Sequence, residues 1–540
     1  MSKRQGSGVR GQGLEKSHIP HPTSHACPIM LQGTASHVGK SILTAALCHI
    51  FKNQGLKVAP FKAQNMALNS FVTLDGGEIG RAQAFQAEAA GILSSIDMNP
   101  ILLKPTSDTG SQVIIHGRVY GNMSAREYHR FKKEAKKYVM ESYSRLSEKN
   151  DVIVIEGAGS PAEINLREND IANMGLAEMV DAPVILIGDI DRGGVFASLI
   201  GTMELLTSPE RKRVQGFIIN KFRGDIELLK PGLDFLENKT GLPVFGVVPY
   251  LKDIILPDED GVVLEQGQGA RGKGQEKNVG WAVPTKRINI SVIKLPRISN
   301  FTDFDAFRFE PDVVLRYITR SAELDYADVV IIPGSKNTIE DLLWLWESGI
   351  SEEIINYTEN GGRVIGICGG FQMLGKCIKD PYGVESGAGM AKGLGLLDVE
   401  TILEREKKIY QIKATIQSGV RSQESGVKGY EIHMGETIGG SKPFANIAKR
   451  NGASVRIEDG AVSDNGRIWG TYIHGIFDND AFRTGLLSEI RAKRSLHMQG
   501  IISFQDKKDQ GIRKLAEVVN KNIDIQRLFH IINSFSDLRC

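Results

Sequence analysis

The sequence predicts an α/β protein of two domains, each a largely parallel β-sheet covered by helices. Its 540 residues exceed what one hydrophobic core usually holds. From Pro28 onward, short apolar runs alternate with helical stretches, which is typical of a parallel sheet with crossover helices. A stretch at 261–286 is dense in Gly, Gln and Lys and has neither helical nor strand periodicity, which favours a linker.

These observations predict domain boundaries and individual elements. We expect a flexible leader at 1–27, a first domain at 28–260, the linker at 261–286, a second domain at 287–482 and a helical tail at 483–540. Expected strands of the first domain are 28–32, 57–61, 151–155, 184–187, 215–219 and 244–248, with helices at 41–54 and 78–92. Expected strands of the second domain are 288–293, 329–332, 364–367 and 468–473.

Composition narrows the function classes. The formal net charge is +2, so the totals do not support a strongly basic face for nucleic acid. No apolar run approaches the roughly 20 residues of a membrane span, and we expect no membrane association. The five cysteines have no repeated spacing, which favours a reducing cytoplasm over a disulfide framework. The oligomeric state stays open.

A phosphate-binding loop is predicted near the start of the first domain. Gly33-Thr34-Ala-Ser-His-Val-Gly39-Lys40-Ser41 follows an apolar run and precedes a helical stretch. Glycines let backbone N–H groups face phosphate oxygens, Lys40 reaches the outer phosphates, and the Ser41 hydroxyl can ligate Mg²⁺. The alternative is a glycine-rich strand-to-helix turn with an incidental lysine.

This loop has one residue more than the standard spacing, and in that it resembles the loop of the dethiobiotin synthetase group. The resemblance implies a P-loop sheet that binds ATP, with Lys62 on phosphate and Glu156 on Mg²⁺. Glu156 follows an expected strand, so it could instead cap the next helix. Asn220, at another strand end, is a candidate for the nucleotide site, and Asp189 and Asp191 are further candidates.

A nucleophilic cysteine is predicted in the second domain. Gly366-Ile-Cys368-Gly369-Gly370 joins an apolar strand to a helical stretch, a setting that activates a thiolate and admits substrate. His474 ends another expected strand and is the candidate base. The backbone N–H groups of Gly334 and Gly369 are candidate oxyanion donors. A lone cysteine or histidine is more often structural, and the glycine setting distinguishes Cys368.

These residues resemble a class I glutamine amidotransferase domain between about 288 and 480. The resemblance implies a flavodoxin-like fold that releases ammonia from L-glutamine. Most members place Glu two residues after the histidine, where this chain has Ile476. The vitamin B12 branch shares that absence, which leaves the group that orients His474 open, with Glu431 and Asp478 as candidates.

Two linked activities suggest amide synthesis, because ammonia needs an acceptor and ATP can activate a carboxylate. The motifs at 61–70, 78–83, 98–105 and 429–435 are similar to those of the cobyric acid synthase family. That resemblance implies a corrinoid substrate, adenosylcobyrinic acid a,c-diamide, amidated at four carboxylates (b, d, e and g). Candidate substrate residues are Asn65, Asn69, Ser70, Arg81 and Gln83, with exposed helix faces and turns as the alternative.

Other enzymes of the same build are the nearest alternatives, namely cobyrinic acid a,c-diamide synthase or a cell-wall amidotransferase. A P-loop partition or switch ATPase is the alternative from another class. Such ATPases carry an extra lysine near the start of the loop, whereas this loop begins Gly33-Thr34, and they do not need Cys368 with His474.

Overall fold

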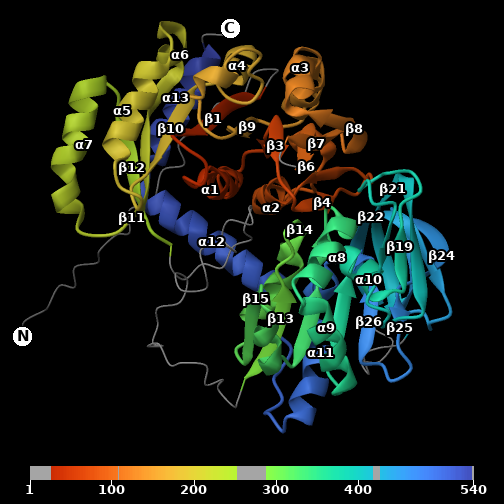
Figure 1. The fold of residues 1–540 in the computed structure, drawn as a ribbon. Helices are drawn as coiled ribbons and strands as arrows, with labels where there is room; N and C mark the ends of the chain where they lie inside the picture. The colour runs from red at the N-terminus through yellow and green to blue at the C-terminus, as the bar shows by residue number, and fades with distance from the viewer. Residues whose placement is uncertain (1–25, 107–108, 252–286, 418–425, 538–540) are drawn as a thin grey trace, which may run out of the picture.

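The computed structural model describes residues 26–106, 109–251, 287–417 and 426–537, so the expected linker and nearly all of the expected leader lie outside the described residues. Two α/β bodies lie side by side (Figure 1). Within the described residues, no helix is both long enough and apolar enough to cross a bilayer.

A six-stranded parallel sheet forms the first body, in the order β12-β11-β10-β1-β9-β2. The central strand is buried along its whole length, as expected for a parallel strand covered on both faces. All six expected strands are present with slightly shifted ends. Their bounds are β1 (Cys27–Gly33), β2 (Val58–Phe61), β9 (Val152–Glu156), β10 (Val184–Asp189), β11 (Val214–Phe222) and β12 (Val244–Pro249).

Helices cover this sheet (Figure 1). The helix expected at 78–92 begins only at Arg81, because the three residues before it pair as a strand. The helices are α1 (Lys40–Asn53), α2 (Arg81–Ala90), α3 (Ala125–Ser147), α4 (Met174–Met179), α5 (Val195–Leu205), α6 (Ser208–Arg213) and α7 (Ile226–Thr240), with 3-10 turns η1 (Ile96–Met98) and η2 (Ile164–Leu166).

Two small sheets between β2 and α3 were not predicted. One has the order β3-β6-β7-β8, and the other is the hairpin β4-β5. They carry Asn65 and Ser70, two of the five polar residues expected to bind substrate, and the hairpin packs against the second body. Their strands are β3 (Gln64–Met66), β4 (Ser70–Val72), β5 (Glu78–Gly80), β6 (Ile101–Pro105), β7 (Gly110–Ile115) and β8 (Arg118–Ser124).

The main sheet of the second body has the order β15-β13-β16-β18-β26-β25, parallel except for β25. Its five parallel strands follow the 2-1-3-4-5 order of flavodoxin-like folds, which confirms the predicted fold class. The strands are β13 (Ile288–Ile293), β15 (Val313–Ile318, not predicted), β16 (Val329–Ile332), β18 (Val364–Ile367), β25 (Ala461–Val462) and β26 (Ile468–Thr471).

A second, mostly antiparallel sheet lies beside it. The expected strand at 468–473 is divided between the two sheets, because β26 pairs with β18 and the short β27 pairs with β22. The strands are β19 (Cys377–Lys379), β20 (Met390–Lys392), β21 (Val399–Ile416), β22 (Gly426–Gly439), β23 (Ala445–Arg450), β24 (Ala453–Asp459) and β27 (Ile473–His474), and β14 (Ile298–Ser299) pairs separately with β17 (Gly334–Ser335).

Helices of the second body include a nine-residue 3-10 segment, η4, that directly follows β14. Hydrophobic residues of η4 and α11 join the core of this body. The helical elements are α8 (Thr338–Glu347), α9 (Ile350–Glu359), α10 (Gly369–Leu374), α11 (Asp480–Lys493), η4 (Phe301–Phe309), η5 (Ser321–Tyr326) and η6 (Ile476–Asp478).

The last two helices return to the first body. These are α12 (Phe504–Asn522) and α13 (Ile525–Asp537), and Leu515, Val519 and Leu528 are fully buried in the same cluster as residues of β1 and α1. Figure 1 shows α12 running from the second body to the first. The C-terminal segment is therefore part of the core of the N-terminal domain.

Candidate active sites

The phosphate loop joins β1 to α1. Gly39 has φ of 101°, a conformation that favours glycine, and a Cβ there would lie 2.1 Å from Asn220 Nδ2. A Cβ at Gly33 would lie 2.4 Å from Val38 Cγ2. The Thr34 N–H donates to the carbonyl of Ile187 in β10 (3.0 Å), which ties the loop to the sheet. Neither position has room for a Cβ beside these side chains, and the absence of one leaves the loop backbone open to phosphate, as a phosphate cradle demands.

Polar side chains converge beside this loop on Glu156. Its carboxylate is 1% exposed and accepts hydrogen bonds from Ser41 Oγ (2.8 Å), Lys62 Nζ (2.8 Å) and Gln86 Nε2 (2.6 Å). Lys40 Nζ donates to the carbonyl of Ala35 within the loop (3.1 Å) and to that of Gly159, which follows β9 (2.9 Å). The structure thus brings the predicted cations and oxygen ligands together at the carboxyl ends of β1, β2 and β9.

A hydroxyl and a carboxylate in contact fit Mg²⁺, which uses one or two carboxylates and completes its shell with water and phosphate oxygens. Among the described residues, no group of three or more His, Cys, Asp or Glu forms a metal cage. Glu156 does not act as a helix cap, because its oxygens accept from the three side chains named above.

Asn220 and the two further aspartates lie on the other side of the loop. Asn220 Nδ2 donates to the carbonyl of Val38 (2.8 Å), so its amide braces the loop backbone. Lys221 Nζ donates to Asp189 (2.7 Å) and to the carbonyl of His37 (2.6 Å), and Asp191 pairs with Arg223 (2.8 Å).

The five expected substrate residues lie together, and they are buried rather than exposed, which excludes the alternative of exposed faces and turns. Asn65 Nδ2 donates to Gln83 Oε1 (3.0 Å), and Arg81 stacks on the Phe71 ring at 5.0 Å. Asn69 and Ser70 instead contact the second body: Asn69 Oδ1 accepts from the N–H of Phe301 (3.1 Å).

Cys368 lies in the sharp turn between β18 and α10. Its φ of 52° and ψ of −109° are strained for a residue with a Cβ, which is the geometry of a nucleophile elbow. Gly370 is required by close packing, because a Cβ there would lie 1.9 Å from the carbonyl oxygen of Ile332. The Cys368 N–H donates to the carbonyl of Thr471 (2.8 Å), so the elbow is fixed to β26, the strand that precedes His474.

The sequence did not identify the group that orients His474, which is Asp303. Asp303 Oδ2 lies 2.6 Å from His474 Nδ1, and Asp303 Oδ1 accepts from the Gly475 N–H (3.1 Å). Burial alone would lower the pKa of His474, but the Asp303 carboxylate and the Cys368 sulfur raise it to about 10. The imidazole therefore carries a proton that it can deliver to a leaving group.

Neither of the two suggested carboxylates takes this role. Glu431 forms a bidentate ion pair with Arg450, at 2.8 Å for each bond. Asp478 is buried, burial raises its pKa to about 6, and Asp303 already occupies the position beside His474 Nδ1. Asp303 lies 171 residues from His474 in the chain, and no fixed motif spacing links the two residues. The only signal for it was its position shortly after an expected strand.

The predicted oxyanion glycines also meet at this site. A Cβ at Gly369 would lie 3.0 Å from the Ser335 nitrogen, and one at Gly334 would lie 3.5 Å from His474 Cε1. The β17 strand and the start of α10 thus face each other beside the sulfur. Backbone groups placed in this way can stabilise an oxyanion.

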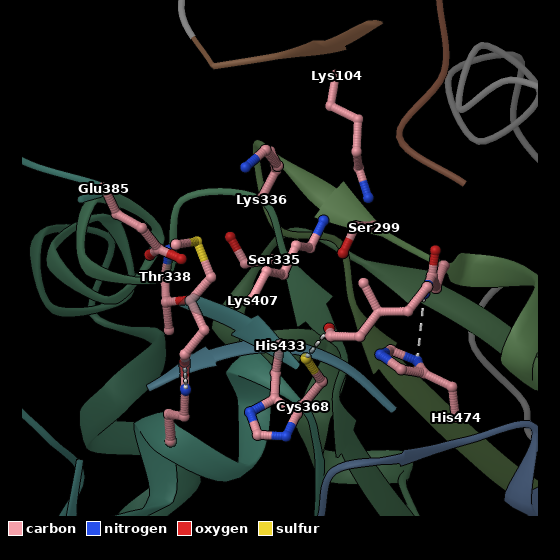
Figure 2. A pocket seen from close by; sticks show the side chains of 14 residues that line it. Lys104, Ser299, Ser335, Lys336, Thr338, Cys368, Glu385, Lys407, His433 and His474 are labelled. Carbon is pink, nitrogen blue, oxygen red and sulfur yellow. Dashed lines mark hydrogen bonds between the residues drawn. The ribbon is translucent and has the colours of Figure 1, made fainter. Parts of the chain in front are cut away.

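A pocket opens over Cys368 and His474 (Figure 2). On its far side Figure 2 shows three lysines, Lys104, Lys336 and Lys407. Lys104 belongs to the first body, and Glu78 of the same body accepts from both Lys104 (2.8 Å) and Lys407 (2.6 Å). The wall of the cysteine pocket is therefore completed by the phosphate-binding domain.

Two further pocket residues were not predicted from the sequence. His433 is 5% exposed and stacks on Tyr472 with ring centroids 3.7 Å apart. Burial lowers its pKa more than Glu431 raises it, so the ring is neutral at pH 7. Glu385 accepts from the Thr338 N–H (2.6 Å), and burial raises its pKa. A carboxylate and lysines around one small pocket suit a zwitterionic amino acid such as glutamine.

The fold and these sites define a glutamine amidotransferase domain joined to a nucleotide-binding domain. Family models agree: residues 289–482 match the CobB/CobQ-like glutamine amidotransferase domain, and residues 29–263 match the CobQ/CobB/MinD/ParA nucleotide binding domain.

Comparison with full-length relatives identifies the family of the whole chain. A cobyric acid synthase from Caldanaerobacter subterraneus subsp. tengcongensis is 50% identical over 95% of this chain and 100% of its own length. One from Clostridium botulinum (strain Loch Maree / Type A3) is 52% identical over 93% and 99%, and one from Syntrophobacter fumaroxidans is 48% identical over 94% and 99%. The chain belongs to the cobyric acid synthase family, among the glutamine-dependent amidating ligases.

Proposed function

We propose that this enzyme converts the b, d, e and g carboxylates of adenosylcobyrinic acid a,c-diamide into carboxamides, giving adenosylcobyric acid in cytoplasmic cobalamin biosynthesis. Each amidation would consume one ATP and one glutamine. The observation that carries the proposal is the shared pocket: Cys368 and His474 of the amidotransferase domain face Lys104 of the nucleotide-binding domain. Full-length identity to cobyric acid synthases supports the acceptor.

Glutamine hydrolysis follows from the geometry of the elbow. The Cys368 sulfur attacks the side-chain carboxamide carbon, while backbone N–H groups at Gly334 and Gly369 bind the oxyanion. His474, held by Asp303, gives its proton to the nitrogen as ammonia leaves. Water then hydrolyses the thioester and releases glutamate. Glu385 and the pocket lysines would hold the two charged ends of the substrate.

Amide formation takes place on the other side of the interface. The acceptor carboxylate attacks the terminal phosphorus of ATP, and an acyl phosphate and ADP result. Ammonia then attacks the acyl carbon and inorganic phosphate leaves. Lys40 and Lys62 would stabilise the phosphate charge, and a Mg²⁺ held by Ser41 and Glu156 would neutralise charge during transfer. Asn65, Arg81 and Gln83 would bind the acceptor.

The test is to separate the two nitrogen sources. We expect Cys368→Ala to abolish glutamine-dependent synthesis and to retain synthesis with ammonium. Mass spectrometry of the corrinoid product counts the steps, because each one replaces a hydroxyl with an amino group. Equal loss with both nitrogen sources would refute the two-site scheme. A product carrying fewer than four new amides at complete conversion would refute the proposed acceptor chemistry.

A further inference from the structure

One turn of the nucleotide-binding domain touches both structures that hold the catalytic imidazole. This turn is Asn69–Ser70, at the start of β4, and both residues are 1% exposed. Arg81, Phe71 and Lys104 surround it on its own domain, and the segment Asn300–Asp303 and Tyr430 contact it from the amidotransferase domain.

The first contact fixes the segment that carries Asp303. Asn69 Oδ1 accepts from the N–H of Phe301 (3.1 Å), and the Ser70 N–H donates to Asn300 Oδ1 (2.9 Å). Asn300 has φ of 52°, its carbonyl accepts from the Asp303 N–H (3.0 Å), and its side-chain nitrogen lies 3.4 Å from His474 Nδ1. These bonds set where η4 begins and hence where the Asp303 carboxylate lies.

The second contact fixes the face of the imidazole. The Tyr430 ring stacks on His474 with centroids 5.3 Å apart and planes 16° from parallel. The Tyr430 hydroxyl donates to the carbonyl of Ser70 (3.4 Å), and Phe71 packs edge-on against the same ring at 5.2 Å. One turn of the first domain therefore holds both the edge and the face of the histidine.

The same turn is also fixed to the phosphate site. The N–H of Arg81, the first residue of α2, donates to the carbonyl of Asn69 (3.2 Å), and Lys104 Nζ donates to Ser70 Oγ (3.0 Å). Five residues along α2, Gln86 donates to Glu156 (2.6 Å). A short helix thus joins the candidate magnesium ligand to the turn that contacts the amidotransferase.

We propose that Asn69 and Ser70 are positioning residues for glutamine hydrolysis, acting on His474 through Asn300–Asp303 and Tyr430 rather than on the corrinoid. The consequence is that efficient hydrolysis requires this turn in place, which limits ammonia release when the two domains are not correctly packed. A misplacement of about 1 Å in a catalytic group can reduce a rate by roughly 100-fold. A small shift of this turn is therefore enough to slow glutamine hydrolysis. This inference rests on the proposed function.

The test uses Asn69→Ala in the full-length enzyme, with Asn122→Ala as the matched control. Asn122 is an exposed residue on β8 of the same domain. For Asn69→Ala we expect the kcat of glutamine hydrolysis to fall by about tenfold or more, with KM changed by less than about threefold. Ammonium-dependent synthesis should be retained. Asn69→Asp, which keeps an acceptor oxygen for the Phe301 N–H, should restore most of the rate.

Alkylation of Cys368 by iodoacetamide gives a readout that does not depend on ATP or corrinoid. A displaced His474 stabilises the thiolate less well, so the pH profile of alkylation should move to higher pH in Asn69→Ala and stay in place in Asn122→Ala. Tyr430→Phe, which removes only the bond to Ser70, should move the profile in the same direction by a smaller amount.

Two results would overturn the proposal. One is normal glutamine hydrolysis in Asn69→Ala with loss of ammonium-dependent synthesis, because the residue would then bind the acceptor. The other is an alkylation profile that moves in neither Asn69→Ala nor Tyr430→Phe. Failure of the wild-type enzyme to amidate a corrinoid would refute the proposed function, and the alkylation profiles would still decide the positioning role.

Discussion

Replacing Asp303 by Asn tests the proposed catalytic role of the Asp303–His474 pair directly. The substitution keeps the shape of the side chain and removes the charge 2.6 Å from His474 Nδ1, where both groups are almost fully buried. A hydrogen bond to a charged group contributes about 1.5–3 kcal/mol, and about 1.4 kcal/mol is tenfold in rate. We therefore expect the kcat of glutamine hydrolysis to fall roughly 10- to 150-fold.

The substitution should also change the pH dependence of glutamine hydrolysis in a defined direction. Asp303 and Cys368 raise the pKa of His474 from 6.5 to about 10, so the imidazolium should persist well above pH 7. In Asp303→Asn that proton is lost at lower pH, and the alkaline limb of hydrolysis should move down. The same pair stabilises the fold fully below pH 6.5, and its contribution is lost as pH rises through about 10.

The assay is the release of glutamate from glutamine across the pH range, with Asp305→Asn as the matched control. Asp305 lies two residues on in the same 3-10 segment and pairs with Arg308 (3.4 Å). The control should keep the wild-type alkaline limb. An Asp303→Asn enzyme with unchanged kcat and an unchanged limb would refute the assignment of Asp303 as the orienting group.

Four further predictions concern the nucleotide-binding domain. Lys40→Ala should abolish synthesis with either nitrogen source yet leave Cys368 open to a glutamine-analogue inhibitor; retained synthesis would contradict the phosphate assignment. Gly39→Ala should raise the KM for ATP, because its Cβ would collide with Asn220, and an unchanged KM would count against the loop geometry. Chelation of divalent metal should stop synthesis and spare glutamine hydrolysis, and synthesis that survives complete chelation would exclude the Mg²⁺ site. Leu515→Ala should lower the free energy of unfolding by about 2–5 kcal/mol in denaturant titrations, whereas an unchanged value would show that α12 does not stabilise the first domain.

Much of the fold follows from local patterns. Every expected strand of the two parallel sheets is present, because buried parallel strands are continuous apolar runs that a sequence displays directly. The small sheets of the first domain escaped prediction, since their strands are three to seven residues long and carry polar residues. The tail was predicted to be helical, but its place in the core of the first domain depends on contacts with β1, α1 and β12, which lie far earlier in the chain.

The candidate sites likewise combine contiguous motifs, which the sequence displays, with residues that only the fold brings together. The phosphate loop and the Cys368 elbow are contiguous, and their chemistry depends on backbone turns that glycine spacing specifies, so the sequence alone determined them. Asp303, His433 and the contacts of Asn69 with Phe301 come from distant segments brought together by packing. Only the tertiary structure decided which carboxylate orients His474 and which side chains join the two domains, because a sequence pattern reports the neighbours of a residue along the chain and not those across a domain interface.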